Sequence, residues 1–176
     1  MRTEYLLDRE VDLILAALTD TNRLVMRVCL RTGLRVGDVL ALKTAQLKPH
    51  FWVTEQKTGK ARQVGLPEPL LSDLRKHAGE HWVFPGRDPR KHQTRQAVWK
   101  DVKRAAEAFR LKQNVGPHSA RKVYAVDLLR KYGDIDRVRR ALNHGSESVT
   151  LIYAMADQQL EAKNRRRRPG SGRRMS

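Results

Sequence analysis

Residues 32–40 read Thr-Gly-Leu-Arg-Val-Gly-Asp-Val-Leu, and this stretch decides how the chain around it is interpreted. An apolar run at helical spacing precedes it, formed by Leu24, Val25, Val28 and Cys29. A second run follows, formed by Val36, Val39, Leu40 and Leu42. Gly33 is suited to the left-handed conformation that ends a helix. The sequence therefore predicts two helices joined by a tight link, with Arg35 and Asp38 at the start of the second helix.

The rest of the chain predicts more helices and one hairpin. Helices are expected from an N-cap at Asp8 to Leu18, from Pro67 to Leu74, from Val98 to Phe109, from His118 to a stop at Gly133, from Ile135 to Leu142, and in a segment ending near Tyr153. Between His50 and Leu66 two extended runs flank turn residues, which predicts a β-hairpin with Lys57 at its tip. A short third strand is expected over 81–84. The predicted fold class is mainly α with a small antiparallel β-sheet, and the three tryptophans are expected in the core.

The composition favours a polyanionic partner. Lysine and arginine number 36 against 19 acidic residues, a formal charge of +17. Leaving out the last fourteen residues, which hold seven bases and no acid, still leaves 29 against 19, or +10. Such a basic body suits phosphate binding, although a merely soluble basic surface or a ribosome-associated or chromatin-like protein remains open. The lone Cys29 indicates a small buried hydrophobe, and no apolar stretch is long enough to cross a bilayer. A soluble, intracellular protein without a membrane partner is expected.

The polar residues are weak indicators when each is taken alone. His118 and Arg121 stand at i and i+3 on one helix, a pair that chance produces often in so arginine-rich a chain. Arg35 fits a surface arginine, Lys57 an ordinary turn lysine, and Tyr153 a core tyrosine. They indicate a function only when their order and spacing along the chain are considered together.

Taken in order, these residues resemble the tyrosine recombinase or phage integrase family. Residues 32–40 resemble its first arginine box, T-G-x-R-x-x-[E/D]-x-L, and Lys57 matches its hairpin lysine. Residues 117–121 match an H-x-x-R box, and 142–144 with 150–154 resemble the closing L-G-H box and its tyrosine. The chain departs from the pattern at Asn143, where glycine is usual, and at Lys122, where histidine is frequent.

The residue types suit phosphoryl transfer to a phenol. Two planar guanidiniums, Arg35 and Arg121, can bind the non-bridging oxygens of a phosphodiester, and His144 can add a third donor. The positive surroundings favour the anionic form of Tyr153, the expected nucleophile. His118 is expected to assist proton movement or brace the phosphate. Lys57 is expected to protonate the leaving 5′ oxygen, and Asp38 to support the site from behind.

The resemblance implies the following expectations. Residues 1–156 would form the catalytic domain, and 157–176 a C-terminal helix with a flexible basic arm. Double-stranded DNA would be the partner, with further contacts from Lys60, Lys122, Arg165, Arg166, Arg167 and Arg168. Cleavage would form a 3′-phosphotyrosyl link with no cofactor and no metal. A tetramer on DNA, a monomer when free, accessory DNA-bending proteins and a location at the host nucleoid are also implied.

Alternatives stay open at this point. A type IB topoisomerase-like or telomere-resolving enzyme shares the chemistry, and a non-catalytic DNA-binding protein shares the fold and charge. Tyr5, Tyr124 and Tyr132 compete with Tyr153 for the nucleophile role. Because family members usually carry a core-binding domain before the first helix, the chain is either a catalytic fragment or a minimal recombinase.

Overall fold

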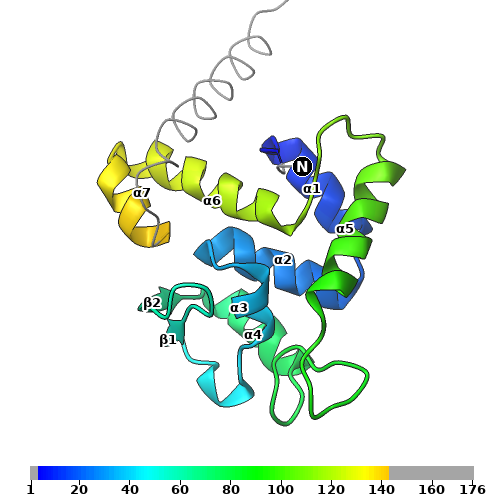
Figure 1. The fold of residues 1–176 in the computed structure, drawn as a ribbon, viewed down its shortest axis with the longest axis vertical. Coiled ribbons are helices and arrows are strands. Elements are labelled where there is room, and N and C mark those ends of the chain that lie inside the picture. Colours follow the sequence, from blue (N-terminus) through cyan, green and yellow to red (C-terminus); the bar gives the residue numbers. More distant parts are fainter. Residues whose placement is uncertain (1–3, 143–176) are drawn as a thin grey trace, which may run out of the picture.

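The computed structural model describes residues 4–142, and helices dominate them (Figure 1). In chain order the elements are α1 (Asp8–Ala17), α2 (Asp20–Thr32), α3 (Val36–Leu40), the 3-10 turn η1 (Thr44–Gln46), β1 (His50–Thr54), β2 (Ala61–Gly65), α4 (Glu68–His77), α5 (Arg95–Ala108), α6 (Pro117–Tyr132) and α7 (Ile135–Leu142). The described part is mainly α with one antiparallel strand pair, which confirms the predicted fold class.

The helix ends follow local chemistry. Gly33 ends α2 and Gly133 ends α6 in left-handed conformations, with φ of +65° and +66°, as the sequence predicts. The predicted N-cap at Asp8 is wrong by one residue: Leu7 is the N-cap of α1. The reason is Glu10, the third residue of the helix, whose Oε2 accepts the Leu7 N–H at 2.7 Å. This bond satisfies the backbone amide of the N-cap residue and stabilises a helix that starts at Asp8.

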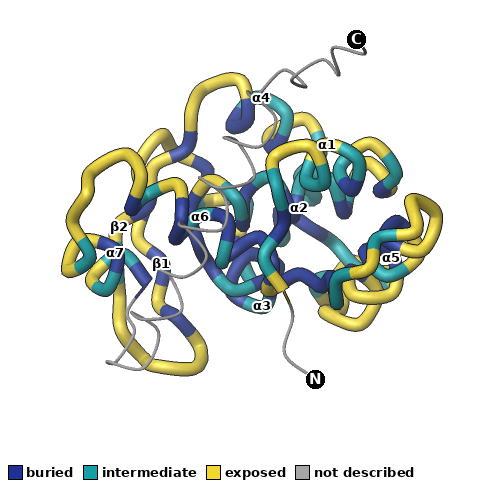
Figure 2. The backbone as a smooth tube through the Cα atoms, turned by 90° about the horizontal axis from the view of Figure 1, so that it is seen from above, coloured by how far each residue is buried: buried dark blue, intermediate teal, exposed yellow. Residues whose placement is uncertain are grey.

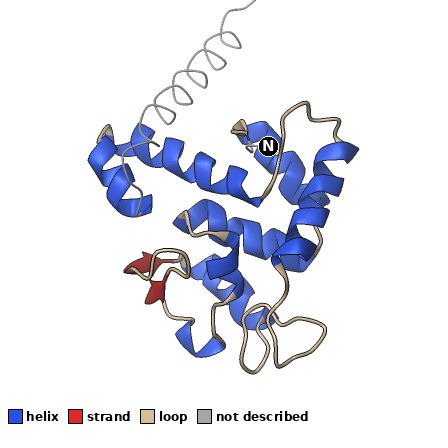
Figure 3. Cartoon of the chain, in the orientation of Figure 1, coloured by secondary structure: helices blue, strands red, loops and turns tan. Residues whose placement is uncertain are grey.

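The hairpin pairs β1 with β2 antiparallel, so that Val53 lies opposite Arg62 and Phe51 opposite Val64. It is the only sheet among the described residues (Figure 3). The predicted third strand over 81–84 is wrong. Trp82 forms only an isolated antiparallel bridge with Lys43. The 3-10 turn η1 begins at Thr44, directly after Lys43, so the pairing of these two segments cannot extend into a strand.

The core gathers around α2. Val25, Val28 and Cys29 on this helix are fully buried, which confirms the expectation for the cysteine. In Figure 2 the buried stretches lie in the middle of the molecule, around α2 and the start of α6, whereas the hairpin turn is exposed. A second cluster of buried side chains holds α7 on α6: Ala125, Val126, Leu129, Val138 and Leu142. Within residues 4–142 no helix is long and apolar enough to cross a membrane.

The expectation that all three tryptophans pack in the core is wrong. Trp52 is 63% exposed because the alternation of β1 turns Phe51 and Val53 inward and Trp52 outward. Trp99 is 48% exposed on α5, where the Lys103 ammonium lies 5.7 Å from its ring centroid. Trp82 is only half-buried, and its ring forms an edge-to-face pair with His92.

Candidate active site

Arg35 occupies the link between α2 and α3. It is the N-cap residue of α3, two residues after the left-handed Gly33. Its Nη1 donates a hydrogen bond to Oε2 of Glu55, and its side chain is only 15% exposed. The short connection predicted from residues 32–40 therefore places a guanidinium in a fixed, largely buried position.

Arg121 enters the same region from α6 and is 7% exposed. Its Nη1 donates to the carbonyl of Gly33 and its Nη2 to the carbonyl of Leu142, the last residue of α7. Nε has no hydrogen-bond partner among residues 4–142. One guanidinium thus joins the α2–α3 link to the end of α7 and keeps a donor to spare.

Glu55 and Arg62 belong to this cluster, and the sequence analysis missed both. The Glu55 carboxylate is fully buried and forms ion pairs with Arg35 and with Arg62, whose Nε lies 3.3 Å from Oε1. The signal was available in the two-residue alternation of the strands. Glu55 lies on the same inward-facing side of the hairpin as Phe51 and Val53, and Arg62 lies on this side in the paired strand. Both charges therefore occupy positions at which a hairpin normally directs apolar side chains into the core.

Lys57 lies in the exposed turn of the hairpin, as predicted. The backbone of Glu55 closes this turn: its carbonyl accepts the Gly59 N–H at 2.8 Å and its N–H donates to the Lys60 carbonyl at 3.0 Å. Asp38 is buried, and its Oδ1 accepts the N–H of Gln56 at 2.9 Å. Asp38 therefore braces the turn that carries Lys57, while Glu55 is the carboxylate that pairs with Arg35.

His118 stands at the start of α6, one turn before Arg121. Its pKa is lowered by partial burial and then by the positive charges of Arg121, Arg35 and Lys57. Burial, followed by the charge of Arg35, also lowers the pKa of Arg121 to about 10, far enough above neutrality for it to stay charged. The imidazole is therefore mostly neutral at neutral pH, next to the positive side chains that lower its pKa.

The structure brings together four predicted catalytic residues from three parts of the chain: Arg35, Lys57, His118 and Arg121. Asp38 lies behind them, Lys60 is exposed just after the turn, and Lys122 follows Arg121 on α6. The remaining predicted residues lie outside the described range: His144, Tyr153 and Arg165 to Arg168. The same holds for the predicted C-terminal helix and arm over 157–176.

The rival tyrosines differ in their surroundings. The ring of Tyr124 lies against Gly33, where a Cβ added to the glycine would come within 2.3 Å of the ring Cδ1. Burial raises the pKa of Tyr5, which makes its phenolate harder to form. Tyr132 is at the far end of α6 from His118, with the Arg137 guanidinium 3.6 Å from its ring centroid. These surroundings favour packing roles for Tyr5 and Tyr124, whereas Tyr132 is 40% exposed and is set apart from the cluster by its place at the other end of α6. The nucleophile role of Tyr153 stays a prediction.

One further arginine lies near the cluster. Arg95, at the start of α5, passes over α3: its Cδ would be 3.2 Å from a Cβ built on Gly37. This exposed arginine makes no ion pair with any residue in 4–142. Because it follows a loop and belongs to no motif, the sequence did not indicate that it would lie near Arg35.

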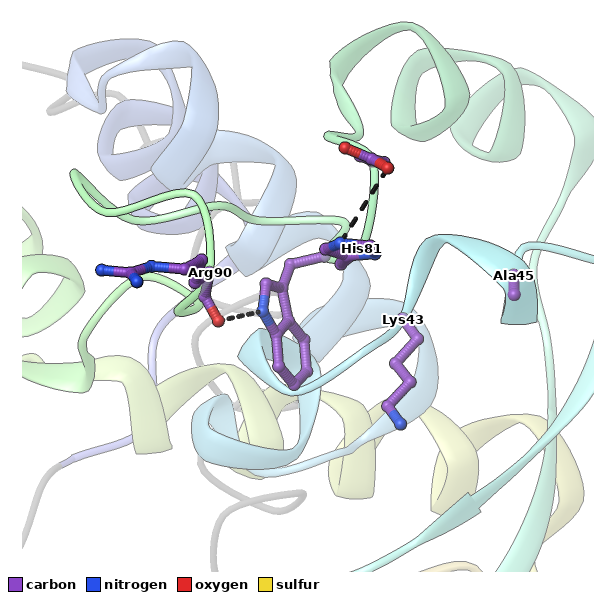
Figure 4. Close-up of a pocket in the computed structure, with 6 residues that line it drawn as sticks. Lys43, Ala45, His81 and Arg90 are labelled. Carbon is purple, nitrogen blue, oxygen red and sulfur yellow. Dashed lines mark hydrogen bonds and ion pairs between the residues drawn. The ribbon is translucent and has the colours of Figure 1, made fainter.

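A surface pocket shares no residue with the arginine cluster (Figure 4). There the Trp82 Nε1–H donates to the Arg90 carbonyl at 3.1 Å, and Lys43 and His81 also line the pocket. No set of His, Cys, Asp and Glu within the described residues could hold a metal ion.

The helices and the hairpin place two guanidiniums, an imidazole and an exposed lysine together. This arrangement is expected of a domain that transfers phosphoryl groups. The sequence profile described as the phage integrase family matches residues 4–159. This chain therefore belongs to the phage integrase family of tyrosine recombinases.

Curated relatives carry names from the same family. The probable integrase/recombinase YoeC of Bacillus subtilis is 30% identical over 135 residues, covering 73% of this chain and 74% of that protein. A tyrosine recombinase of Thermosipho africanus is 29% identical over 166 residues, covering 89% and 59%. The integrase of Escherichia phage P2 is 30% identical over 155 residues, covering 86% and 43%. The chain thus spans about half the length of the last two relatives.

Solved structures show the same fold. XerA recombinase matches with a TM-score of 0.72 and 22% identity, over 96% of this chain and 67% of that one. A lambda integrase dimer bound to a COC′ core site matches with a TM-score of 0.70 and 22% identity, over 83% and 59%. The fold is that of tyrosine recombinase catalytic domains.

Proposed function

We propose that this chain is the catalytic domain of a site-specific DNA recombinase or integrase that cuts and rejoins strands through a 3′-phosphotyrosyl bond at Tyr153. One observation carries the proposal: Arg35 and Arg121, both largely buried, converge with His118 below an exposed lysine turn. Three guanidiniums, those of Arg35, Arg62 and Arg121, outnumber the buried carboxylates of Glu55 and Asp38, and this excess of positive charge favours the binding of an anion. A phosphodiester supplies that anion.

The chemistry assigns a task to each residue. The oxygen of Tyr153 attacks the phosphorus and the bond to the 5′ oxygen breaks. Arg35 and Arg121 stabilise the charge on the non-bridging oxygens, with His144 as a third donor. His118, neutral because its pKa is lowered, accepts the phenolic proton. The Lys57 ammonium gives a proton to the leaving 5′ oxygen. Rejoining reverses each transfer, so the bond energy is kept and no cofactor is consumed.

The partner we propose is double-stranded DNA. Lys57, Lys60 and Arg95 are exposed around the cluster and can meet phosphates on either side of the cut. Lys122 and the Arg165 to Arg168 run would add contacts that do not depend on sequence. A location at the nucleoid of a host cell follows from this partner.

We propose assembly as a tetramer on DNA, from chains that are monomers when free. Recombining two duplexes requires four strand cuts, and one chain carries a single Tyr153. The likeness to lambda integrase, solved as a tetramer bound to a Holliday junction, supports this expectation.

The test is capture of the covalent intermediate. The protein is incubated with a pool of nicked duplexes of randomised sequence, and DNA that stays attached after denaturation is sequenced. The chosen site is then rebuilt as one nicked duplex, on which wild type should form an adduct and Tyr153→Phe none. An adduct that persists in Tyr153→Phe, or no adduct in wild type on any duplex, would refute the proposal.

A leaving-group substitution isolates Lys57. Replacing the bridging 5′ oxygen with sulfur gives a leaving group that needs no proton. The Lys57→Ala variant should cleave the sulfur substrate at nearly the wild-type rate while failing on the oxygen substrate. Arg35→Ala should fail on both, because its task concerns the non-bridging oxygens.

A supercoiled plasmid separates recombination from the topoisomerase alternative. Relaxation without dependence on the selected site would favour a type IB topoisomerase-like enzyme. Strand exchange between two plasmids that both carry the site would favour the recombinase.

A further inference from the structure

A buried carboxylate lies between two arginines beneath the proposed active site. Glu55 is fully buried, and it contacts Arg35 through Oε2 and Arg62 through Oε1. The side chains of Arg35 and Arg62 are 15% and 12% exposed. Because an isolated buried carboxylate is strongly disfavoured, the three groups must be placed as one unit. Fixing Glu55 therefore fixes the direction of both guanidiniums.

The second arginine extends this unit to the ends of two helices. Arg62 Nη1 donates to the carbonyl of Ala141, and Nη2 donates to the carbonyl of Thr32 at 2.9 Å. Arg121 binds the next carbonyl in each helix end, those of Leu142 and Gly33. Carbonyls in the last turn of a helix lack helical partners and carry partial negative charge, so they suit a cation. Two guanidiniums thus join the carboxyl ends of α2 and α7 side by side.

The ends that are joined lead directly to the chemistry. Arg35 follows the end of α2 by three residues. Asn143 and His144 follow the end of α7, and Tyr153 lies nine residues beyond His144. A shift of α7 relative to α2 would therefore move the nucleophile's segment relative to the phosphate-binding arginine.

We propose that Glu55 and Arg62 are positioning residues of this active site, which hold Arg35 in place and set the end of α7 against it. The proposal rests on the proposed function. Neither residue is assigned contact with DNA: the carboxylate would repel a phosphate, and Nη1 and Nη2 of Arg62 both donate to protein carbonyls. Their contribution is alignment, and a misplacement of about 1 Å can lower a rate about 100-fold.

The experiment measures adduct formation and DNA binding on the same nicked duplex. Glu55→Gln should slow adduct formation about 100-fold. Noncovalent affinity at fixed salt should stay the same or rise, because a negative charge is removed next to the arginine that would bind the phosphate. Glu68→Gln is the matched control: it makes the same chemical change at the exposed ion pair with Arg75, and it should change neither quantity.

Two further variants separate positioning from loss of folding. Arg62→Lys keeps the charge but cannot serve Glu55 and two carbonyls at once, so it should also slow adduct formation while its melting curve stays close to that of wild type. Glu55→Gln should cost clearly less in an Arg35→Ala background than alone, because the part of its effect that passes through Arg35 is already lost. Wild-type rates in both Glu55→Gln and Arg62→Lys, or losses that multiply in the double variant, would overturn the proposal.

A measurement without DNA keeps this inference apart from the proposed function. In the free protein, the guanidinium protons of Arg35 and Arg62 should exchange slowly with solvent in nuclear magnetic resonance spectra, and those of Arg35 should exchange fast in Glu55→Gln. Fast exchange in wild type overturns the positioning role whatever the activity. Slow exchange in a wild type that forms no adduct would leave the positioning intact and refute the recombinase chemistry.

Discussion

Gly33 offers a perturbation whose magnitude follows from the structure, namely Gly33→Ala. Two independent costs arise at this position. The backbone has φ of +65°, where a Cβ is disfavoured by about 1–2 kcal/mol. The added Cβ would also lie 2.3 Å from Cδ1 and 2.5 Å from Cε1 of Tyr124, so the ring must move. Overpacking of this kind costs about 1–3 kcal/mol. The free energy of unfolding should therefore fall by about 2–5 kcal/mol.

Gly133→Ala is a matched control in the same chain. Gly133 also ends a helix, with φ of +66°, but a Cβ there meets nothing within 4 Å. It should cost only the conformational part, about 1–2 kcal/mol. The loss of unfolded-state entropy that favours alanine is the same at both positions and cancels in the difference. The difference between the two variants thus isolates the contact with the Tyr124 ring.

The assay is urea unfolding of the two variants, with Gly33→Ala repeated in a Tyr124→Ala background. Removing the ring should reduce the cost of Gly33→Ala to that of Gly133→Ala, a coupling of about 1–3 kcal/mol. Equal losses in the two single variants, or no coupling in the double variant, would show that the close approach of Tyr124 to Gly33 does not exist in solution. In that case the placement of the link that carries Arg35 would also be wrong.

Three further predictions concern titration, DNA binding and thiol chemistry. The pKa of His118 in the free protein should lie below its ordinary 6.5, measured by its ring resonances. Because the folded state then binds fewer protons than the unfolded state, the free energy of unfolding should fall as the pH drops below about 6.5 and level off below the pKa of the folded state. This pH dependence should be absent in His118→Gln. A titration midpoint of the His118 ring above 6.5 would contradict the cluster of positive charges around this residue. Arg95→Ala should weaken DNA binding and reduce the slope of log affinity against log salt by about 0.9 if Arg95 meets one phosphate, as titrations at several salt concentrations would show; an unchanged slope would remove it from the interface. Cys29 is fully buried and burial raises its pKa to about 12, so an aromatic disulfide reagent should label it only as fast as the chain unfolds; rapid labelling under native conditions would speak against the packing of α2.

The sequence predicted the elements whose signals are local. Glycines at the ends of α2 and α6, the turn residues around Lys57 and the apolar spacing of the helices each act within a few residues. That Arg35, Lys57 and the H-x-x-R pair would converge was expected from the resemblance to the tyrosine recombinase family, not from local pattern. The local predictions depend on short-range geometry, and short-range geometry can be read from the chain itself.

The errors share a different cause. Trp52 and Trp99 are large apolar residues, yet a two-stranded hairpin has only one covered face, and α5 has only one buried stripe. Whether an apolar residue is covered depends on what packs against it, which no local pattern states. The missing third strand has the same origin, since its pairing with residues 42–44 is limited by where η1 begins.

Glu55 and Arg62 show how such residues can be found before a structure exists. Each occupies an inward position of a hairpin whose other inward residues are apolar: Phe51, Val53 and Val64. A charge at such a position is tolerated only when a partner of opposite charge reaches it. Two opposite charges on the inward faces of paired strands therefore predict each other, and a carboxylate with spare oxygens predicts a third, cationic partner from elsewhere in the chain. Here that partner is Arg35, which lies outside the hairpin, so the pleat of two strands predicts that such a partner exists and the structure identifies it.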